Sequence, residues 1–271
     1  MISFIGGGNM ASALIAGLAG KLTAGINIHV VDPNADVLAR LSQQYGVSTA
    51  TSIGEALALS DVIVLAVKPQ NMRDVAAALL PHLAASQPLI LSIAAGIRAV
   101  DLSRWLCGYA AIVRSMPNTP ALIGMGITGL VAMEGVSEAQ KATADDIMKA
   151  VGQTVWLDDE AQIDPVTAVS GSGPAYVFYF IEAMQQAAVE LGLSPEQGRQ
   201  LALATFAGAA QLAAQSSDPV PLLREKVTSK GGTTYAALTS MEESGVKAKI
   251  IEAIKAAAAR GRELGDELGK A

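Results

Sequence analysis

Residues 2–11 read Ile-Ser-Phe-Ile-Gly-Gly-Gly-Asn-Met-Ala, and this stretch decides the fold of the 271-residue chain. An apolar strand-like run leads directly into the pattern G-x-G-x-x-A, and an apolar helical stretch, Ala11–Leu18, follows. In such a turn Gly6 permits the sharp bend, Gly8 lets the backbone approach a bound group, and Ala11 lets the helix pack closely on the strand. The helix N-terminus supplies backbone amides and partial positive charge for an anion. The pattern therefore predicts a loop that binds the pyrophosphate of a dinucleotide through Gly6, Gly7, Gly8, Asn9 and Met10.

Short β-branched runs alternate with helical runs over residues 1–159. The expected strands are Ile2–Ile5, Ile28–Val31, Val62–Val67, Leu89–Ile93, Ala111–Arg114 and Ile127–Ala132. The expected helices between them include Ala11–Leu18, Ala35–Tyr45 and Asp74–Leu83. The middle strands are nearly all apolar, as in a sheet that is covered on both faces. This alternation predicts an α/β Rossmann-like domain with a doubly wound parallel sheet and right-handed crossovers.

From residue 160 to residue 271 the pattern is helical, and we expect a separate all-helical dimerisation domain. The expected helices are Pro174–Leu191, Pro195–Gln215, Thr234–Ser244 and Val246–Leu268, with a short segment around Leu222–Val227 between the second and the third. Ser194 and Gln197 form a capping box around Pro195 at the first helical position. The helix that starts there is apolar almost all round, so we expect it to be buried, and a domain this small would bury it against a second copy of the chain.

Composition excludes several classes of function. The chain is 51% hydrophobic and only 16% charged, which suggests apolar surface covered by another subunit. A net charge of −6 without a run of Lys or Arg argues against nucleic-acid binding. The first 20 residues lack a basic segment and are interrupted by glycines, and residues 115–133 contain two prolines, so neither reads as a membrane span or a signal peptide.

Cysteine and histidine are scarce. Cys107 is the single cysteine and cannot close an internal disulfide, and His29 and His82 do not form a recognised zinc-ligand spacing with it. We therefore expect metal-free chemistry in a reducing, cytoplasmic setting.

The end of the second expected strand carries Asp32, Pro33 and Asn34. An acidic side chain here can hold the ribose hydroxyls of a dinucleotide and would repel a 2′-phosphate, which favours NAD over NADP. The alternative is that Asp32 is the N-cap of the next helix, with Pro33 at its first position. The choice between NAD and NADP stays open at this level.

Two further strand ends carry loops at the edge where doubly wound sheets bind ligands. One loop contains Ala66, Val67, Lys68 and Pro69. The other contains Ala94 and Ala95, small residues against which a flat nicotinamide can lie. Each could be an ordinary turn between strand and helix, but together with the glycine loop they favour a cofactor cleft.

Three later motifs complete the pattern: Met116–Pro120 (MPNTP), Ser170–Tyr176 (SGSGPAY) and Val227–Thr234 (VTSKGGTT). With the glycine loop and Ala66–Pro69, they resemble the pyrroline-5-carboxylate reductase family. The resemblance covers essentially the whole chain in order. The last motif is the specific one, because the earlier loops are shared with other two-domain dehydrogenases.

The resemblance implies reduction of the C=N bond of 1-pyrroline-5-carboxylate by NADPH or NADH, which gives L-proline in the last step of proline biosynthesis. It implies a catalytic Thr234 near the imine nitrogen and a substrate loop of Ser229, Gly231, Gly232, Thr233 and Thr234. Glycines followed by threonines at a helix N-terminus also suit a carboxylate physically, because they present amides and hydroxyls. We expect a homo-oligomer that dimerises through the helical domains, and we also consider a higher ring of dimers.

Two residues of this expected site each have two possible interpretations. Many family members have proline where this chain has Lys230, which either assists anion capture or is a solvated loop lysine. Glu160 matches a family position near cofactor and substrate, but a surface carboxylate is an equal alternative.

Two other functions remain open. The first is a two-domain hydroxyacid dehydrogenase, which needs a base; Lys226 and Lys230 are available, but neither lies in a helix facing the cleft. The second is a nicotinamide-nucleotide sensor without turnover. Oxidation of 3-hydroxy acids would favour the first, and cofactor binding without substrate-dependent oxidation would favour the second.

Overall fold

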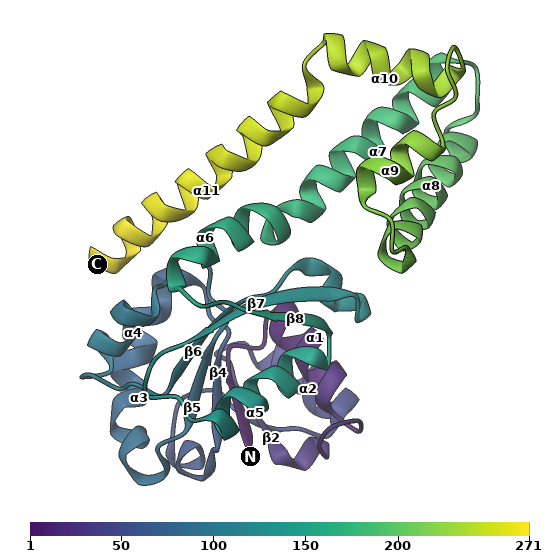
Figure 1. Cartoon of the computed structure of the whole chain (residues 1–271). Coiled ribbons are helices and arrows are strands. Elements are labelled where there is room, and N and C mark those ends of the chain that lie inside the picture. The colour runs from purple at the N-terminus through teal and green to yellow at the C-terminus, as the bar shows by residue number, and fades with distance from the viewer. Residues whose placement is uncertain (271) are drawn as a thin grey trace. The chain divides into compact units, whose positions relative to one another are not determined.

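The computed structural model describes residues 1–270 (Figure 1). It contains two compact units, which we describe separately. Unit 1 comprises Met1–Ser172 together with the end of the chain from Ala257, and unit 2 comprises Gly173–Ala256.

Unit 1 is built on an eight-stranded sheet in the order β3-β2-β1-β4-β5-β6-β7-β8. The strands are β1 (Ile2–Ile5), β2 (Ile28–Val31), β3 (Ser48–Ala50), β4 (Val62–Leu65), β5 (Leu89–Ser92), β6 (Ile112–Met116), β7 (Gly126–Ala132) and β8 (Gly152–Trp156). From β1 the chain winds outward to β3 and then returns to the other side of β1 with β4. The predicted doubly wound sheet is thereby confirmed.

Helices cover both faces of this sheet. They are α1 (Asn9–Leu18), α2 (Ala35–Tyr45), α3 (Met72–Ser86), α4 (Ala99–Trp105), α5 (Glu138–Lys149) and α6 (Ile163–Val166). Successive side chains of a strand point to opposite faces. Accordingly, Phe4 joins a core cluster with Leu14 of α1, whereas Ile5 joins a second cluster with Leu79 of α3. The apolar middle strands are therefore buried on both sides, as the sequence predicted.

Short 3-10 segments connect these elements. They are η1 (Gly25–Asn27), η2 (Glu55–Leu59), η3 (Pro69–Asn71), η4 (Thr119–Ile123) and η5 (Glu160–Gln162). A π-helical segment, η6 (Thr167–Gly171), follows α6. The first residues of the SGSGPAY motif, Ser170 and Gly171, therefore lie in a helical turn rather than in a loop.

The sheet departs from the expectation of parallel strands at one pair. β7 runs antiparallel to β6, while every other neighbouring pair in residues 1–270 is parallel. Residues 117–125, which join these two strands, are too few for the crossover of a dozen or more residues that a parallel pair needs. Strands β3 and β8 and helices α4 and α5 also lie outside the predicted elements.

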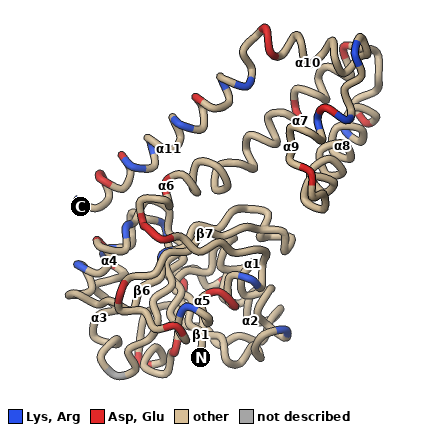
Figure 2. Tube along the Cα trace, in the orientation of Figure 1, with Lys and Arg blue, Asp and Glu red and all other residues tan. Residues whose placement is uncertain are grey.

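Unit 2 is helical. It contains α7 (Gly173–Glu190), α8 (Pro195–Gln215), α9 (Val220–Lys226), α10 (Thr233–Glu243) and the first part of α11 (Val246–Lys270). The predicted capping box of α8 is confirmed: Ser194 Oγ accepts the Gln197 amide at 3.2 Å, and Gln197 Oε1 accepts the Ser194 amide at 2.9 Å. Along α11, Lys and Arg are interspersed with Asp and Glu (Figure 2).

Helix α8 is exposed in the single chain rather than buried. Leu201 is 56% exposed and Leu212 is 60% exposed. Phe206 meets Phe180 of α7, with ring centroids 6.4 Å apart. The apolar surface that remains is the kind that a second subunit covers. Among residues 1–270, no helix combines the length and the apolar character needed to cross a membrane.

His29 of β2 provides a testable feature of the sheet. It is buried, and its Nδ1 lies 2.9 Å from Ser48 Oγ, which itself donates to the Ile28 carbonyl at 3.2 Å. Burial lowers the pKa of His29 below its ordinary value of 6.5.

A pH dependence of stability follows from His29. Because the folded pKa is lowered, the unfolded chain binds more protons just below pH 6.5, and the free energy of unfolding falls as the pH falls through this range. We expect His29→Gln to show a shallower loss of stability between about pH 7 and pH 5. Urea unfolding at both pH values measures it; equal slopes for the two proteins would contradict the role of His29.

Candidate active site

Three predicted cofactor loops meet at one edge of the sheet. Ile5 pairs with Leu65, and Leu65 pairs with Ser92, so strands β1, β4 and β5 end side by side. Between β1 and β4 the direction of winding reverses, and ligands of doubly wound sheets bind outside the strand ends at such a switch point. The structure therefore brings together the glycine loop and the loops that begin at Ala66 and Ile93.

The first turn of the glycine loop requires glycine. Gly6 has a φ of +99°, and a Cβ on it would lie 2.5 Å from the Ala66 carbonyl oxygen. Gly8 differs, because a Cβ there would meet nothing within 4 Å. Gly8 is the N-cap of α1, and no side chain caps this helix. The first amides of α1 are thus left for a ligand, in an open space beside Gly8.

Asp32 links two of the loops that the sequence predicts to bind the cofactor. Its Oδ2 accepts the Gly7 amide at 2.7 Å, and its Oδ1 accepts the Asn34 amide at 2.8 Å. The alternative that Asp32 is the N-cap of the next helix is wrong: Asn34 caps α2, and its Oδ1 accepts the amides of Asp36 and Val37. The Gly7 amide is therefore engaged within the protein rather than left for a phosphate.

The loop after β5 combines buried and exposed residues. Ala94 is buried, and its amide donates to Ser92 Oγ at 3.4 Å. Ala95 is exposed, and Gly96 turns the chain with a φ of +76°. In the neighbouring loop Lys68 is exposed as well. Of these two alanines, only Ala95 exposes its side chain at this edge of the sheet.

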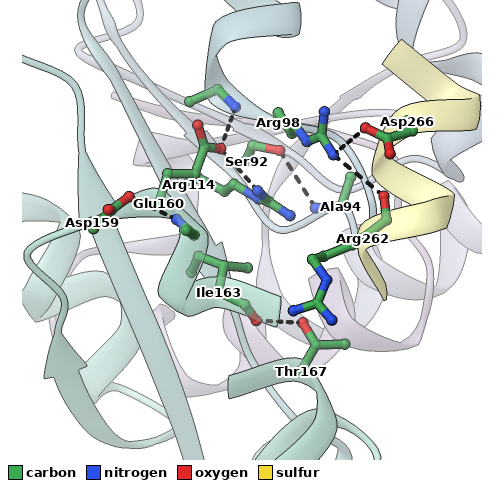
Figure 3. Close-up of polar contacts among 12 residues, drawn as sticks. Ser92, Ala94, Arg98, Arg114, Asp159, Glu160, Ile163, Thr167, Arg262 and Asp266 are labelled. Atoms are coloured by element: carbon green, nitrogen blue, oxygen red, sulfur yellow. Dashed lines mark hydrogen bonds and ion pairs between the residues drawn. The ribbon is translucent and has the colours of Figure 1, made fainter. Parts of the chain in front are cut away.

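Glu160 is an ion-paired carboxylate rather than a free one on the surface. Its Oε1 accepts from Arg114 Nη1 at 2.9 Å and from the Ala99 amide at 2.6 Å (Figure 3). Arg114, on β6, is only 4% exposed. Arg114 could not be found from the sequence, since a single arginine in an apolar strand gives no sign of its partner 46 residues away.

Asn118 of the MPNTP motif has a structural role that the sequence pattern does not predict. Asn118 is buried, its Oδ1 accepts the Ile127 amide at 3.0 Å, and its Nδ2 donates to the Ser170 carbonyl at 3.2 Å. This one side chain therefore fixes the β6–β7 connection to the start of the SGSGPAY motif.

In unit 2, the predicted substrate loop lies at the N-terminus of α10. Gly231 has a φ of +73°, which favours glycine, and Gly232 is the N-cap of α10 without any side-chain cap. The Gly232 amide donates to the Ser229 carbonyl at 3.0 Å, and a Cβ on Gly232 would lie 2.6 Å from Ser229 Oγ. The turn therefore directs the Ser229 hydroxyl toward the helix end.

The remaining residues of this loop are open to solvent in the single chain. Thr233 and Thr234 occupy the first two positions of α10, and both are exposed, as is Lys230. The first amides of a helix have no partner within the helix, so the loop presents amides and hydroxyls together. This arrangement can accept a carboxylate without an arginine.

Comparison with known proteins covers both units. A family model described as pyrroline-5-carboxylate reductase dimerisation matches residues 160–264, and one described as NADP oxidoreductase, coenzyme F420-dependent, matches residues 1–96. The pyrroline-5-carboxylate reductase of Pseudomonas aeruginosa is 47% identical over 99% of this chain and 98% of its own length. This chain belongs to the pyrroline-5-carboxylate reductase family. The resemblance seen in the motifs is confirmed.

Solved structures agree with this family assignment. A pyrroline-5-carboxylate reductase from Coxiella burnetii is 40% identical, with a TM-score of 0.92 over 97% of both chains. A Plasmodium falciparum pyrroline carboxylate reductase with NADP bound is 31% identical, with a TM-score of 0.86 over 97% of both chains. The Rossmann-like domain followed by a helical dimerisation domain is thus the family's build.

Proposed function

We propose that this chain is a pyrroline-5-carboxylate reductase, which uses NADPH or NADH to reduce 1-pyrroline-5-carboxylate to L-proline in the last step of proline biosynthesis. The observation that carries this function is the 47% identity to a pyrroline-5-carboxylate reductase over 99% of the chain, which spans both units. In the reaction the carbon of the C=N bond gains a hydride and the nitrogen gains a proton, so the imine becomes a secondary amine.

The reduced nicotinamide supplies the hydride, and unit 1 would hold it. The residues fit this group, because Gly8 leaves room beside the uncapped α1 where a pyrophosphate can approach. We assign the phosphate contacts to the amide of the N-cap Gly8 and to the first amides of α1, those of Asn9 and Met10. Gly6 and Gly7 shape the turn, and the cofactor set further includes Asn34, Lys68 and Pro69 at the neighbouring strand ends.

The preference between NADPH and NADH is tied to Asp32. Both of its carboxylate oxygens already accept backbone amides, so its negative charge is fixed beside the expected place of the ribose. That charge disfavours a 2′-phosphate. The family model for residues 1–96 is nevertheless an NADP oxidoreductase model. We therefore propose that the chain accepts both cofactors.

In unit 2, we propose that the loop of Ser229, Gly231, Gly232 and Thr233 holds the substrate carboxylate. The uncapped N-terminus of α10 supports this assignment. Thr234, in the first turn of the same helix, would hydrogen-bond the imine nitrogen. Glu160 would act near the cofactor and substrate through its contacts with Arg114 and Ala99.

An imine needs little acid or base help from the protein. A cyclic imine can arrive already protonated and accept the hydride directly, so the site requires orientation and exclusion of water rather than a strong acid. This fits a substrate loop of amides and hydroxyls. A hydroxyacid dehydrogenase, in contrast, would need a base to take a hydroxyl proton.

We further propose a domain organisation of residues 1–159 for the cofactor and 160–271 for dimerisation and substrate. The dimerisation model over residues 160–264 and the exposed apolar residues of α8 support a homo-oligomer. A ring of dimers is the larger assembly we propose, in the reducing cytoplasm that suits the free Cys107. Analytical ultracentrifugation distinguishes a ring of dimers from a single dimer, and a monomer would contradict both.

The function is tested by measuring oxidation of NADPH and NADH at 340 nm with and without pyrroline-5-carboxylate. We expect oxidation that depends on the substrate and a product identified as proline. Binding of the cofactor without turnover would favour the sensor alternative, and turnover only with 3-hydroxy acids would favour the dehydrogenase alternative. Either outcome would overturn the proposal.

A further inference from the structure

The segment that follows the Ala94–Ala95 loop is packed against the last turns of α11, within unit 1. Gly261, Gly265 and Gly269 recur every four residues and so share one face of this helix. A Cβ on Gly265 would lie 2.9 Å from Arg98 Nε, and one on Gly269 would overlap the Asp101 carboxylate. Glycine on this face therefore lets α11 approach the 96–101 segment closely.

Polar contacts join the same two segments. Arg98 Nη2 donates to Asp266 Oδ1 at 2.6 Å and to the Arg262 carbonyl at 3.3 Å (Figure 3). Arg104 of α4 donates to the Gly269 carbonyl. Arg98 thus reaches across to a side chain and to the backbone of α11 at once, which fixes its orientation better than a single ion pair.

Apolar contacts place the loop itself. A Cβ on Gly96 would lie 2.9 Å from Leu268 Cδ1 and 3.6 Å from Leu264 Cβ, so these two leucines lie directly over the turn. Leu268 packs against the core cluster that contains Ala94 and Ile97. On the other side, Glu160 accepts the amide of Ala99, the residue after Arg98. The loop is therefore held at its C-terminal end by α11 and by Glu160.

We propose that Arg98 is a positioning residue that, through Asp266 and the glycine face of α11, holds the Ala94–Ala95 loop in place for the nicotinamide half of the cofactor. This inference rests on the proposed function. The effect reaches the cofactor through backbone, since Arg98 follows Ala95 by three residues. The ion pair of Arg98 with Asp266 contributes little to the free energy of folding, because these side chains are 34% and 59% exposed and exposed ion pairs are weak.

The test is a double-mutant cycle of Arg98→Ala, Asp266→Ala and the double variant in the full-length enzyme. We expect each single variant to raise the KM for NADPH roughly fivefold to twentyfold, less than the hundredfold cost of a 1 Å misplacement. Because both substitutions break one contact, the double variant should be no worse than the Arg98 variant. Additive effects, or an unchanged KM in all three, would overturn the proposal.

A readout beyond activity separates positioning from general damage. Inhibition by 2′-phospho-ADP-ribose, which is NADP without its nicotinamide, should keep the same Ki within about twofold in every variant, because the phosphate loop is untouched. Thermal unfolding should stay near that of the wild type. An equal rise in the KM for NADPH and in this Ki would assign Arg98 to the whole cofactor site and overturn the inference.

Two further variants complete the design. Arg260→Ala is the matched control, because Arg260 is an exposed arginine of α11 whose ion pairs among residues 1–270 are with Glu263 and Glu267 of its own helix; its kinetics should equal the wild type. Gly265→Ala keeps every charge but pushes the Arg98 guanidinium, and it should give a smaller rise in KM. A wild type that binds NADPH but lacks reductase activity contradicts the proposed function, whereas an active wild type with unaffected variants contradicts only the positioning role.

Discussion

Replacing Gly8 with valine is expected to weaken NAD(P)H binding on the order of 100-fold while the sheet stays folded. A valine side chain would occupy the space where a pyrophosphate approaches the first amides of α1. Loss of about two charge-assisted hydrogen bonds, each contributing roughly 1.5–3 kcal/mol, is sufficient for that effect. The substitution spares the fold, because a Cβ at Gly8 meets nothing within 4 Å and its φ of −63° suits any residue.

Fluorescence titration measures this prediction, with Trp105 and Trp156 as the reporters. Gly8→Ala should give a smaller loss, so affinity should fall as the side chain grows. Gly6→Ala is the contrasting variant: its Cβ would clash with the Ala66 carbonyl at a φ of +99°, so it should lower the thermal unfolding temperature. Unchanged cofactor affinity in folded Gly8→Val protein would remove the phosphate-binding role from this loop.

The strand, glycine loop and helix at the start of the chain could be predicted because each signal is local. α2 spans Ala35–Tyr45, the range that its periodicity and the closing Gly46 predicted. By contrast, β3 is only three residues long, partly exposed and rich in small polar side chains, so it carries no alternating pattern. Helix α5 does carry a local signal in the sequence, because Ser137 and Gln140 form a capping box at its start.

Asp32 shows why the sequence alone cannot decide which of two neighbouring residues caps a helix. Asp32 and Asn34 have the same capping chemistry and lie two residues apart. What decides between them is the Gly7 amide, which lies 25 residues earlier in the chain and engages Asp32. Asn34 is then left to cap α2. A local pattern predicts that a cap exists here, but a long-range hydrogen bond selects the residue.

The contacts around Arg98 lie furthest from what sequence reveals. Arg98 and Asp266 are 168 residues apart, and neither lies in a motif. The spacing of Gly261, Gly265 and Gly269 was the available signal, since glycines are costly inside helices and their recurrence on one face indicates close packing. This glycine spacing predicts that one face of α11 is closely packed, but it does not predict which segment packs against that face. The loop motifs therefore predicted which edge of the sheet would bind the cofactor, but not the elements that hold this edge in place.

Thr234→Ala is expected to lower kcat roughly tenfold to a hundredfold, at or below the low end of the range for full acid catalysis. The hydroxyl would form one hydrogen bond with the nitrogen of the protonated imine and so orient the C=N bond for hydride transfer, and a hydrogen bond to a charged group contributes about 1.5–3 kcal/mol. Thr234 is exposed in the first turn of α10 and its removal uncovers no core, so stability should not change.

Two variants of the same helix sharpen this test. Thr234→Ser keeps the hydroxyl and should retain most of the activity, whereas Thr239→Ala removes a threonine hydroxyl more than one turn further along α10 and should leave kcat unchanged. The reaction is followed by NADPH oxidation with saturating pyrroline-5-carboxylate, so that kcat is separated from KM. A loss confined to the KM for pyrroline-5-carboxylate would mean that Thr234 binds the substrate equally in its ground and transition states. Wild-type kcat in Thr234→Ala would contradict the role of Thr234 at the imine nitrogen and leave the loop as a carboxylate receptor alone.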